Sequence, residues 1–174
     1  RARATIRRMS AVFLSYASED AAAAMRIRDA LQAAGVEVWF DQSELRGGDA
    51  WDASIRARIK DCALFVPIVS ANTDARGEGY FRLEWKLGVA RSELMADDEP
   101  FLLPVAIDQT PESSARVPDA FRERQWMRVD DERSAEKFAA RVQDLLDSPR
   151  EARRAGRSEA RKRAAWAAAR DSGD

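Results

Sequence analysis

The most apolar stretch of the chain is Ala63-Leu64-Phe65-Val66-Pro67-Ile68-Val69. A run of this length and composition predicts a strand that is covered on both faces, because such strands carry few polar residues. Pro67 has no amide hydrogen, so the hydrogen-bond ladder should become irregular near the carboxyl end of this strand. The sequence on either side decides what kind of sheet the strand belongs to.

Shorter apolar runs recur along the chain and alternate with amphipathic segments. Strands are predicted at residues 11–14, 36–40, 101–107 and, at an edge, 126–129. Helices are predicted at roughly 18–34, 49–62, 80–94 and 134–146. This alternation predicts an α/β fold, a flavodoxin-like doubly wound sheet of about five parallel strands with helices on both faces.

Several residues define the ends and faces of these helices. Ser18 and Asp49 stand where N-caps belong, and Gly35 supplies a left-handed stop after the first helix. The second helix is predicted to bury Trp51, Ile55, Ile59 and Cys62. The helix at 80–94 is predicted to turn inward Leu83, Leu87, Ala90 and Leu94.

Ligands of doubly wound sheets bind beyond the carboxyl ends of the strands. The loops at 15–19, 41–49 and 70–80 are therefore the places to look for function. Two common sites are excluded there. Ser70 and Ala71 follow the third strand, so a phosphoacceptor aspartate is absent at its end. Arg46-Gly47-Gly48 lacks the spaced glycines and the lysine of a phosphate-binding loop.

The composition limits the chemistry further. The 174 residues are 45% hydrophobic and 34% charged, which is typical of a globular domain. With no histidine and only Cys62, the chain excludes a disulfide framework, a Cys2His2 zinc site and a Ser-His-Asp triad. We predict Cys62 to be a core residue. No apolar run approaches the ~18 residues of a membrane span, and no signal peptide is visible, so we expect a cytoplasmic protein.

The charge is distributed unevenly, although the net charge is only −1. Residues 1–8 carry four arginines and no acid, and residues 149–174 carry eight basic against four acidic residues. We therefore expect a basic extension at 1–8, a domain at 9–148 and an Ala/Arg-rich tail or linker at 149–174. That linker would lead to a sensor, effector or membrane-anchored region. The acidic domain is not expected to bind nucleic acid.

An ordered set of short motifs runs from about residue 10 to residue 130. It begins with Phe13-Leu14-Ser15-Tyr16-Ala17-Ser18-Glu19-Asp20 and Val38-Trp39-Phe40-Asp41. It continues with Leu45-Arg46-Gly47-Gly48-Asp49-Ala50-Trp51, Ser70-Ala71-Asn72 and Leu83-Glu84-Trp85. The set resembles Toll/interleukin-1 receptor (TIR) domains, particularly bacterial ones of the NAD+-cleaving type. The segment at 45–51 is similar to the BB loop of that family.

The resemblance implies an NAD+ glycohydrolase that releases nicotinamide and ADP-ribose or a cyclic isomer. Glu84 matches the essential glutamate of the family, and Tyr80 stands where an aromatic residue, commonly tryptophan, is found. NAD+ would be the substrate, with no cofactor and no metal. The implied substrate contacts are Tyr16, Ala17, Ser18, Trp39, Asp41 and Tyr80. Leu45, Arg46, Gly47 and Gly48 would serve assembly with other TIR domains, on which activity commonly depends.

The residues around Glu84 agree with this reading. Helical geometry places Glu84 about 40° from Tyr80 and offers it no cation one turn away. A single carboxylate can stabilise the oxocarbenium-like state of glycosidic cleavage. Nicotinamide leaves as a neutral molecule and needs no general acid, so the absence of histidine does not exclude the reaction.

Alternatives stay open for each residue. Glu84 could be a solvated helix residue or pair with a distant arginine. Trp39 could be a core aromatic, Ser18 a plain N-cap and Asp41 a cap of its loop, while Arg46 could contact phosphates instead of another domain. At the level of function, the chain could be a non-catalytic TIR–TIR interaction module, or a domain that binds NAD+ without cleaving it.

Overall fold

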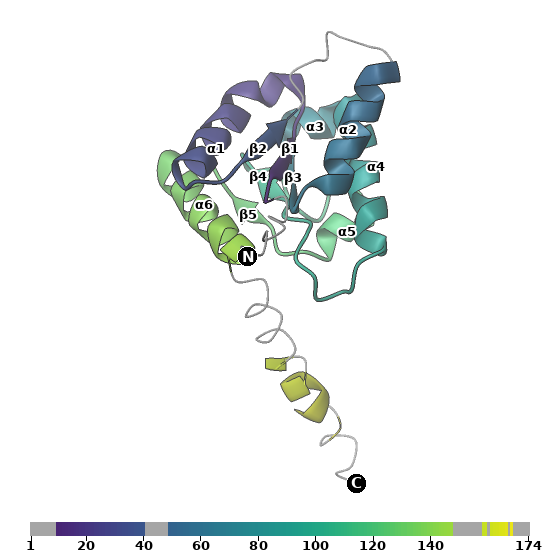
Figure 1. Cartoon of the computed structure of the whole chain (residues 1–174), viewed down its shortest axis with the longest axis vertical. Coiled ribbons are helices and arrows are strands. Elements are labelled where there is room, and N and C mark those ends of the chain that lie inside the picture. The colour runs from purple at the N-terminus through teal and green to yellow at the C-terminus, as the bar shows by residue number, and fades with distance from the viewer. Residues whose placement is uncertain (1–9, 41–48, 148–157, 160, 167, 169–174) are drawn as a thin grey trace, which may run out of the picture.

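The computed structural model describes residues 10–40, 49–147, 158–159, 161–166 and 168. Its strands are β1 (Val12–Ser15), β2 (Val38–Phe40), β3 (Leu64–Val69), β4 (Val105–Ala106) and β5 (Met127–Arg128). Every pairing is parallel, and the strand order is β2-β1-β3-β4-β5 (Figure 1). This order confirms the predicted flavodoxin-like fold and the edge position of the last strand.

Helices connect the strands and cover both faces of the sheet. They are α1 (Ala21–Ala33), α2 (Asp49–Asp61), α3 (Ala71–Ala75), α4 (Tyr80–Glu93), α5 (Asp119–Arg122) and α6 (Glu132–Asp147). Helices α1 and α6 pack together on one face, and α2 and α4 pack together on the other, where α5 also lies (Figure 1). None of the helices in the described ranges combines the length and the apolar character needed to span a bilayer.

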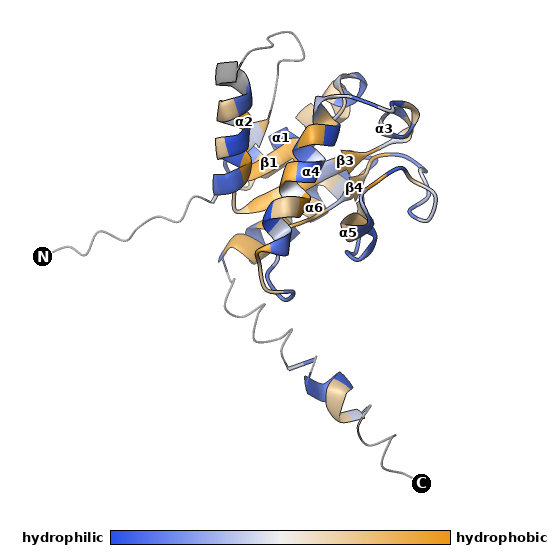
Figure 2. Cartoon of the chain, turned by 90° about the vertical axis from the view of Figure 1, so that its right-hand side faces the viewer, coloured by the Kyte–Doolittle hydropathy of each residue, from blue (hydrophilic) through white to orange (hydrophobic). Residues whose placement is uncertain are grey.

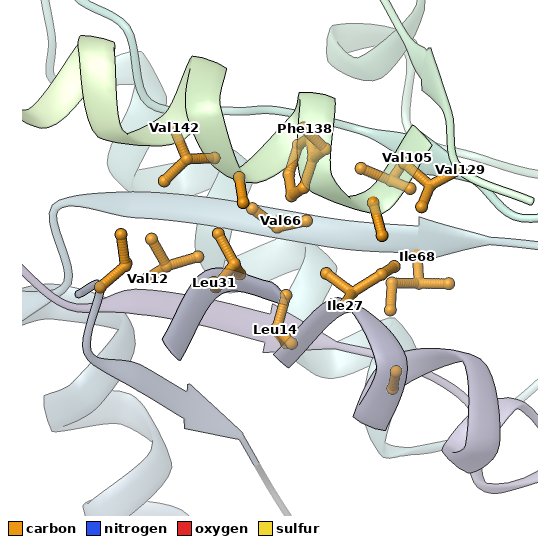
Figure 3. Packing of buried hydrophobic residues seen from close by; sticks show 14 of the residues in the cluster. Val12, Leu14, Ile27, Leu31, Val66, Ile68, Val105, Val129, Phe138 and Val142 are labelled. Atoms are coloured by element: carbon orange, nitrogen blue, oxygen red, sulfur yellow. The ribbon is translucent and has the colours of Figure 1, made fainter. Parts of the chain in front are cut away.

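Each face of the sheet has its own hydrophobic core. The first cluster fills the space between the sheet, α1 and α6, with Leu14, Val66 and Phe138 near its centre (Figure 3). The second lies under α2, α4 and α5 and includes Phe13, Phe65 and Trp85. Figure 2 shows hydrophobic residues concentrated in the strands and hydrophilic residues on the outward sides of the helices. The two clusters together hold the sheet between its helical layers.

Pro67 interrupts the ladder as predicted. Phe65 pairs with Leu102 as an isolated bridge, and regular pairing of β3 with β4 resumes only at Ile68 and Val69. A proline nitrogen cannot donate, and Pro67 and Pro104, which both lie between these two points, therefore add no hydrogen bond of their own to the ladder. This explains why the predicted strand at 101–107 is reduced to the two residues of β4.

The prediction of the buried face of the fourth helix is mostly wrong, although Leu87 packs against the core as predicted. The residues of α4 that are buried are Phe81, Glu84, Trp85 and Gly88, whereas Leu94 is 90% exposed. Two apolar stripes overlap on this helix, and the aromatic one faces the sheet because Gly88 permits a close approach to the ring of Phe65. Glu84 therefore lies in the middle of the buried face of the helix.

Helix ends agree with the sequence in part. Gly35 adopts a positive φ of 81°, as expected of a left-handed stop. Ile55, Ile59 and Cys62 are buried as predicted, and Asp49 begins α2. Ser18 is not the N-cap of a long helix, because a short 3-10 turn, η1 (Ser18–Asp20), precedes α1 and has Ala17 as its cap. The loop predicted at 70–80 contains the unpredicted helix α3.

Candidate functional site

Glu84 lies inside the molecule, where α4 crosses the carboxyl end of β1. Its side chain is 2% exposed, and its Oε1 accepts a hydrogen bond of 2.7 Å from the Oγ of Ser15. Ser15 is the last residue of β1 and is fully buried. This contact excludes the alternative that Glu84 is a solvated helix residue. It also adds Ser15, which the sequence reasoning quoted in a motif without giving it a role.

The strand alternation explains why Ser15 reaches Glu84. Successive side chains of a strand point to opposite faces of the sheet, so Phe13 and Ser15 share one face and Leu14 and Tyr16 share the other. Phe13 belongs to the core cluster under α2 and α4, and Leu14 belongs to the cluster under α1 and α6. A buried glutamate on α4 therefore meets the only polar side chain that β1 turns toward that helix.

The predicted substrate contacts separate into two groups. Trp39 pairs with Phe13 in the sheet, packs against the cluster under α4 and donates its Nε1–H to Glu37 at 3.0 Å. Tyr16 packs against the cluster on the opposite face. The structure therefore places the side chain of Trp39 on the same side of the sheet as Glu84 and the side chain of Tyr16 on the other side.

The turn after β1 presents backbone atoms rather than side chains to the candidate site. Ala17 is fully buried in the cluster under α4, whereas Ser18 is exposed and its Oγ lies 3.4 Å from Glu19 Oε2. Tyr80 is the first residue of α4, is half-buried and stands one helical turn before Glu84. Asp41, Leu45, Arg46, Gly47 and Gly48 lie outside the described residues.

A second polar group lies at the carboxyl edge of the sheet and was not predicted. Asp20 is buried and accepts hydrogen bonds from Ser70 Oγ at 2.5 Å and from Asn72 Nδ2 at 2.8 Å. Ser70 and Thr73 form a reciprocal capping box that starts α3. These bonds join the turn after β1 to the segment after β3, so they hold the rim of the candidate site in one shape. The sequence signal was the Ser-Ala-Asn motif itself.

Asp108 supports the same rim from the loop after β4. Its carboxylate accepts hydrogen bonds from the backbone N–H of Ala71 and from both the N–H and the hydroxyl of Thr110. Burial acts to raise the pKa of Asp108, but these bonds and the charge of Arg128 outweigh it and lower the pKa below its ordinary value. The carboxylate therefore stays charged and fixes the start of α3.

The described residues contain no group of three or more histidine, cysteine, aspartate or glutamate side chains arranged to hold a metal ion. Cys62 is fully buried, and burial raises the pKa of its thiol to about 12, although the nearby Arg91 acts in the opposite direction. A thiol of this kind is not a nucleophile at neutral pH. The prediction that Cys62 is a core residue is confirmed.

Solved structures share this fold at low sequence identity. A TIR-STING receptor from C. gigas matches with a TM-score of 0.58 and 17% identity over 75% of this chain, although the chain spans only 38% of that receptor's length. The TIR domain of the Toll-related receptor TRR-2 from Hydra magnipapillata matches with a TM-score of 0.56 and 14% identity, over 78% of this chain and 97% of that domain.

A third similar structure is an enzyme. The CMP N-glycosidase BcmB of Clostridium botulinum has a TM-score of 0.51 and 16% identity, over 76% of this chain and 99% of that protein. No curated protein sequence matches the chain. Residues 12–146, which include all five strands and Glu84, match the sequence model of the TIR domain, and the chain therefore belongs to the TIR domain family.

Proposed function

We propose that this TIR domain is an NAD+ glycohydrolase and that Glu84 is its catalytic carboxylate. The observation that carries the proposal is the buried Glu84 at the carboxyl edge of β1, oriented by Ser15 among apolar side chains. A buried carboxylate is expensive unless it is hydrogen-bonded, and such groups concentrate at functional sites. Ligands of this sheet topology also bind at that edge.

The proposed reaction needs little beyond this carboxylate. The bond between nicotinamide and ribose C1′ breaks with its electron pair going to the ring nitrogen, so nicotinamide leaves as a neutral molecule. The ribose becomes an oxocarbenium-like cation, which the negative charge of Glu84 stabilises. Water then adds to C1′ and loses a proton, giving ADP-ribose; attack by a nitrogen of the adenine would give a cyclic isomer instead.

The burial of Glu84 bears on when the enzyme would be active. With 2% of its side chain exposed, the carboxylate meets a substrate only after neighbouring side chains have moved. We propose that contacts with further copies of the domain favour this movement, so that NAD+ and other TIR domains are both partners of the chain. BcmB has a similar fold and is named as an N-glycosidase, which supports the proposal that a domain of this architecture can cleave a glycosidic bond.

The deciding experiment measures nicotinamide release from NAD+ by concentrated protein, with and without a crowding agent. The Glu84→Gln variant keeps the size of the side chain and removes its charge, and we expect it to abolish release. Glu93→Gln, an exposed glutamate on the same helix, serves as the matched control and should retain activity. Release that is equal in both variants would remove Glu84 from the mechanism.

A non-catalytic TIR–TIR interaction module is the second candidate. The same burial favours it, because a glutamate hydrogen-bonded to Ser15 at the centre of the α4 face could serve the fold alone. No nicotinamide release even from assembled protein, together with no binding of NAD+ in titration calorimetry, would favour this reading. Signalling would then survive Glu84→Gln and fail with a change at Arg46 or Gly48.

A further inference from the structure

A shallow groove lies on the side of α4 that faces away from Glu84. It has a volume of about 390 Å³ and is bounded by residue 77, by α4 and by the turn at residues 116–118 that leads into α5. Basic residues in its lining are Arg82, Lys86 and Arg116, and no acidic residue lines it. Three cations from two separate segments therefore converge on one concave surface.

Arg82 is fixed in place by backbone carbonyls. Its Nη1 donates to Arg116 O at 2.6 Å and its Nη2 donates to Thr73 O at 2.6 Å. Its guanidinium also stacks over the ring of Trp85, 5.5 Å from the centroid. Burial and, after it, the charge of Arg116 lower the pKa of Arg82. The two guanidinium groups are thus close enough to repel each other, and Arg82 cannot rotate away.

The positive charge of the groove is not neutralised by ion pairs. Within the described ranges, none of Arg82, Lys86 and Arg116 makes a salt bridge. The charge of Asp74 acts on Arg82 in the stabilising direction, but Asp74 accepts a hydrogen bond of 2.7 Å from the backbone N–H of Arg116 and does not line the groove. A bound anion would relieve the repulsion between the cations.

Trp85 gives a second, independent indication. This side chain is 1% exposed and lines the groove, and its Nε1–H is buried without an acceptor among the described residues. Buried donors are nearly always hydrogen-bonded, so a donor without an acceptor points to a further group near this wall.

We propose that this groove binds the phosphate groups of a small phosphorylated ligand. Its volume is within the usual range for sites of small ligands, roughly 300–1,000 Å³. Arginine and lysine side chains are the usual ligands of phosphate oxygens, and Lys86 and Arg116 would fill this role here. Arg82 would contribute its charge, because its Nε, Nη1 and Nη2 already donate to the backbone carbonyls of residues 73, 76 and 116. The site is separate from the candidate catalytic site, because Arg82 and Lys86 lie about 160° around the helix from Glu84. It therefore does not depend on whether the domain cleaves NAD+.

Titration calorimetry of the whole chain with inorganic pyrophosphate, and in parallel with ADP, tests the proposal. Lys86→Glu is the informative variant, because Lys86 is exposed and its reversal disturbs no packed side chain. We expect it to weaken binding by about tenfold or more. Lys137→Glu, an exposed lysine on α6, carries the same change in net charge and should leave binding unaltered.

The two ligands separate the possible sources of the phosphate. If pyrophosphate and ADP bind with equal affinity, the site recognises phosphate groups alone. If ADP binds more tightly, and Lys86→Glu weakens its binding to the same extent, the site recognises a nucleotide. ADP that binds near Glu84 instead would be insensitive to Lys86→Glu, which would overturn the proposal. Absence of binding by either ligand, or equal weakening by both lysine variants, would overturn it as well.

Discussion

Ser15 determines the direction in which the carboxylate of Glu84 points. Its hydroxyl holds Oε1 at 2.7 Å, and neither side chain is in contact with solvent that could replace the bond. We expect Ser15→Ala to lower kcat for nicotinamide release by about tenfold, since a hydrogen bond to a charged group is worth about 1.5–3 kcal/mol. KM should change little, because Ser15 positions the carboxylate and does not touch NAD+.

Steady-state kinetics across a range of NAD+ concentrations checks this expectation. Ser113→Ala removes a hydroxyl from an exposed residue between β4 and α5, away from the candidate site, and is the matched control. Unchanged kcat in Ser15→Ala would show that the packing of α4 alone orients Glu84. Restored activity in Ser15→Thr would indicate that the hydroxyl, and not the volume of the side chain, is required.

At the scale of the element, the distance between α4 and β3 depends on Gly88. A β-carbon added at this position would lie 2.9 Å from the ring of Phe65, closer than carbon atoms approach. Phe65 cannot move aside, because its ring stacks on Phe13 with a centroid distance of 5.7 Å. Overpacking of this kind usually costs about 1–3 kcal/mol, which outweighs the gain of about 1 kcal/mol from placing alanine in a helix.

We therefore expect Gly88→Ala to lower the free energy of unfolding, as measured by urea denaturation. Gly77→Ala is the control, since the nearest atom to its added β-carbon is the end of the flexible Arg116 side chain at 3.4 Å. A Gly88→Ala protein as stable as the parent would mean that α4 moves away from Phe65 without a loss of stability. In that case the movement of α4 should also change the position of Glu84 over β1.

The same helix shows where prediction from sequence succeeds and where it ends. The strands were predictable because a short apolar run between two turns seldom forms anything other than a buried strand. The face of α4 was not, because its leucine stripe and its aromatic stripe are both helical in period, and only the fit of Gly88 against Phe65 decides between them. The fit of Gly88 against Phe65 is a tertiary contact, so the sequence of the helix alone does not predict it.

The residues of the candidate site also divide into those that the sequence predicts and those that it does not. Glu84 was predictable from its motif, but its partner Ser15 is 69 positions away and requires knowledge of which face of β1 lies under α4. The alternation along β1 puts the side chain of Tyr16 on the face opposite Ser15, which the sequence pattern already indicated. Asp20 and Ser70 were visible in the motifs, yet their contact depends on two loops meeting at the edge of the sheet.

For the whole molecule, Asp108 links stability to pH. Its folded-state pKa is lowered, and the unfolded value is about 3.9, so the stabilisation is fully present above that value and is lost as the pH falls through the folded pKa. Urea denaturation at pH 6 and pH 3 should show that Asp108→Asn loses less stability on acidification than the parent. Asp144→Asn, an exposed residue of α6, should lose as much as the parent.

The irregular pairing at Pro67 divides the sheet into two parts, and the free energy of local opening differs between them. Strands β1 and β3 are joined by four consecutive residue pairs, whereas β3 and β4 share two pairs and one isolated bridge. Native proteins open first where few bonds must break together. Amide protons of β4 and β5 should therefore exchange with deuterium through local opening, while those of β1 exchange only when the whole domain unfolds. The strand that orients Glu84 belongs to the half of the sheet that opens last.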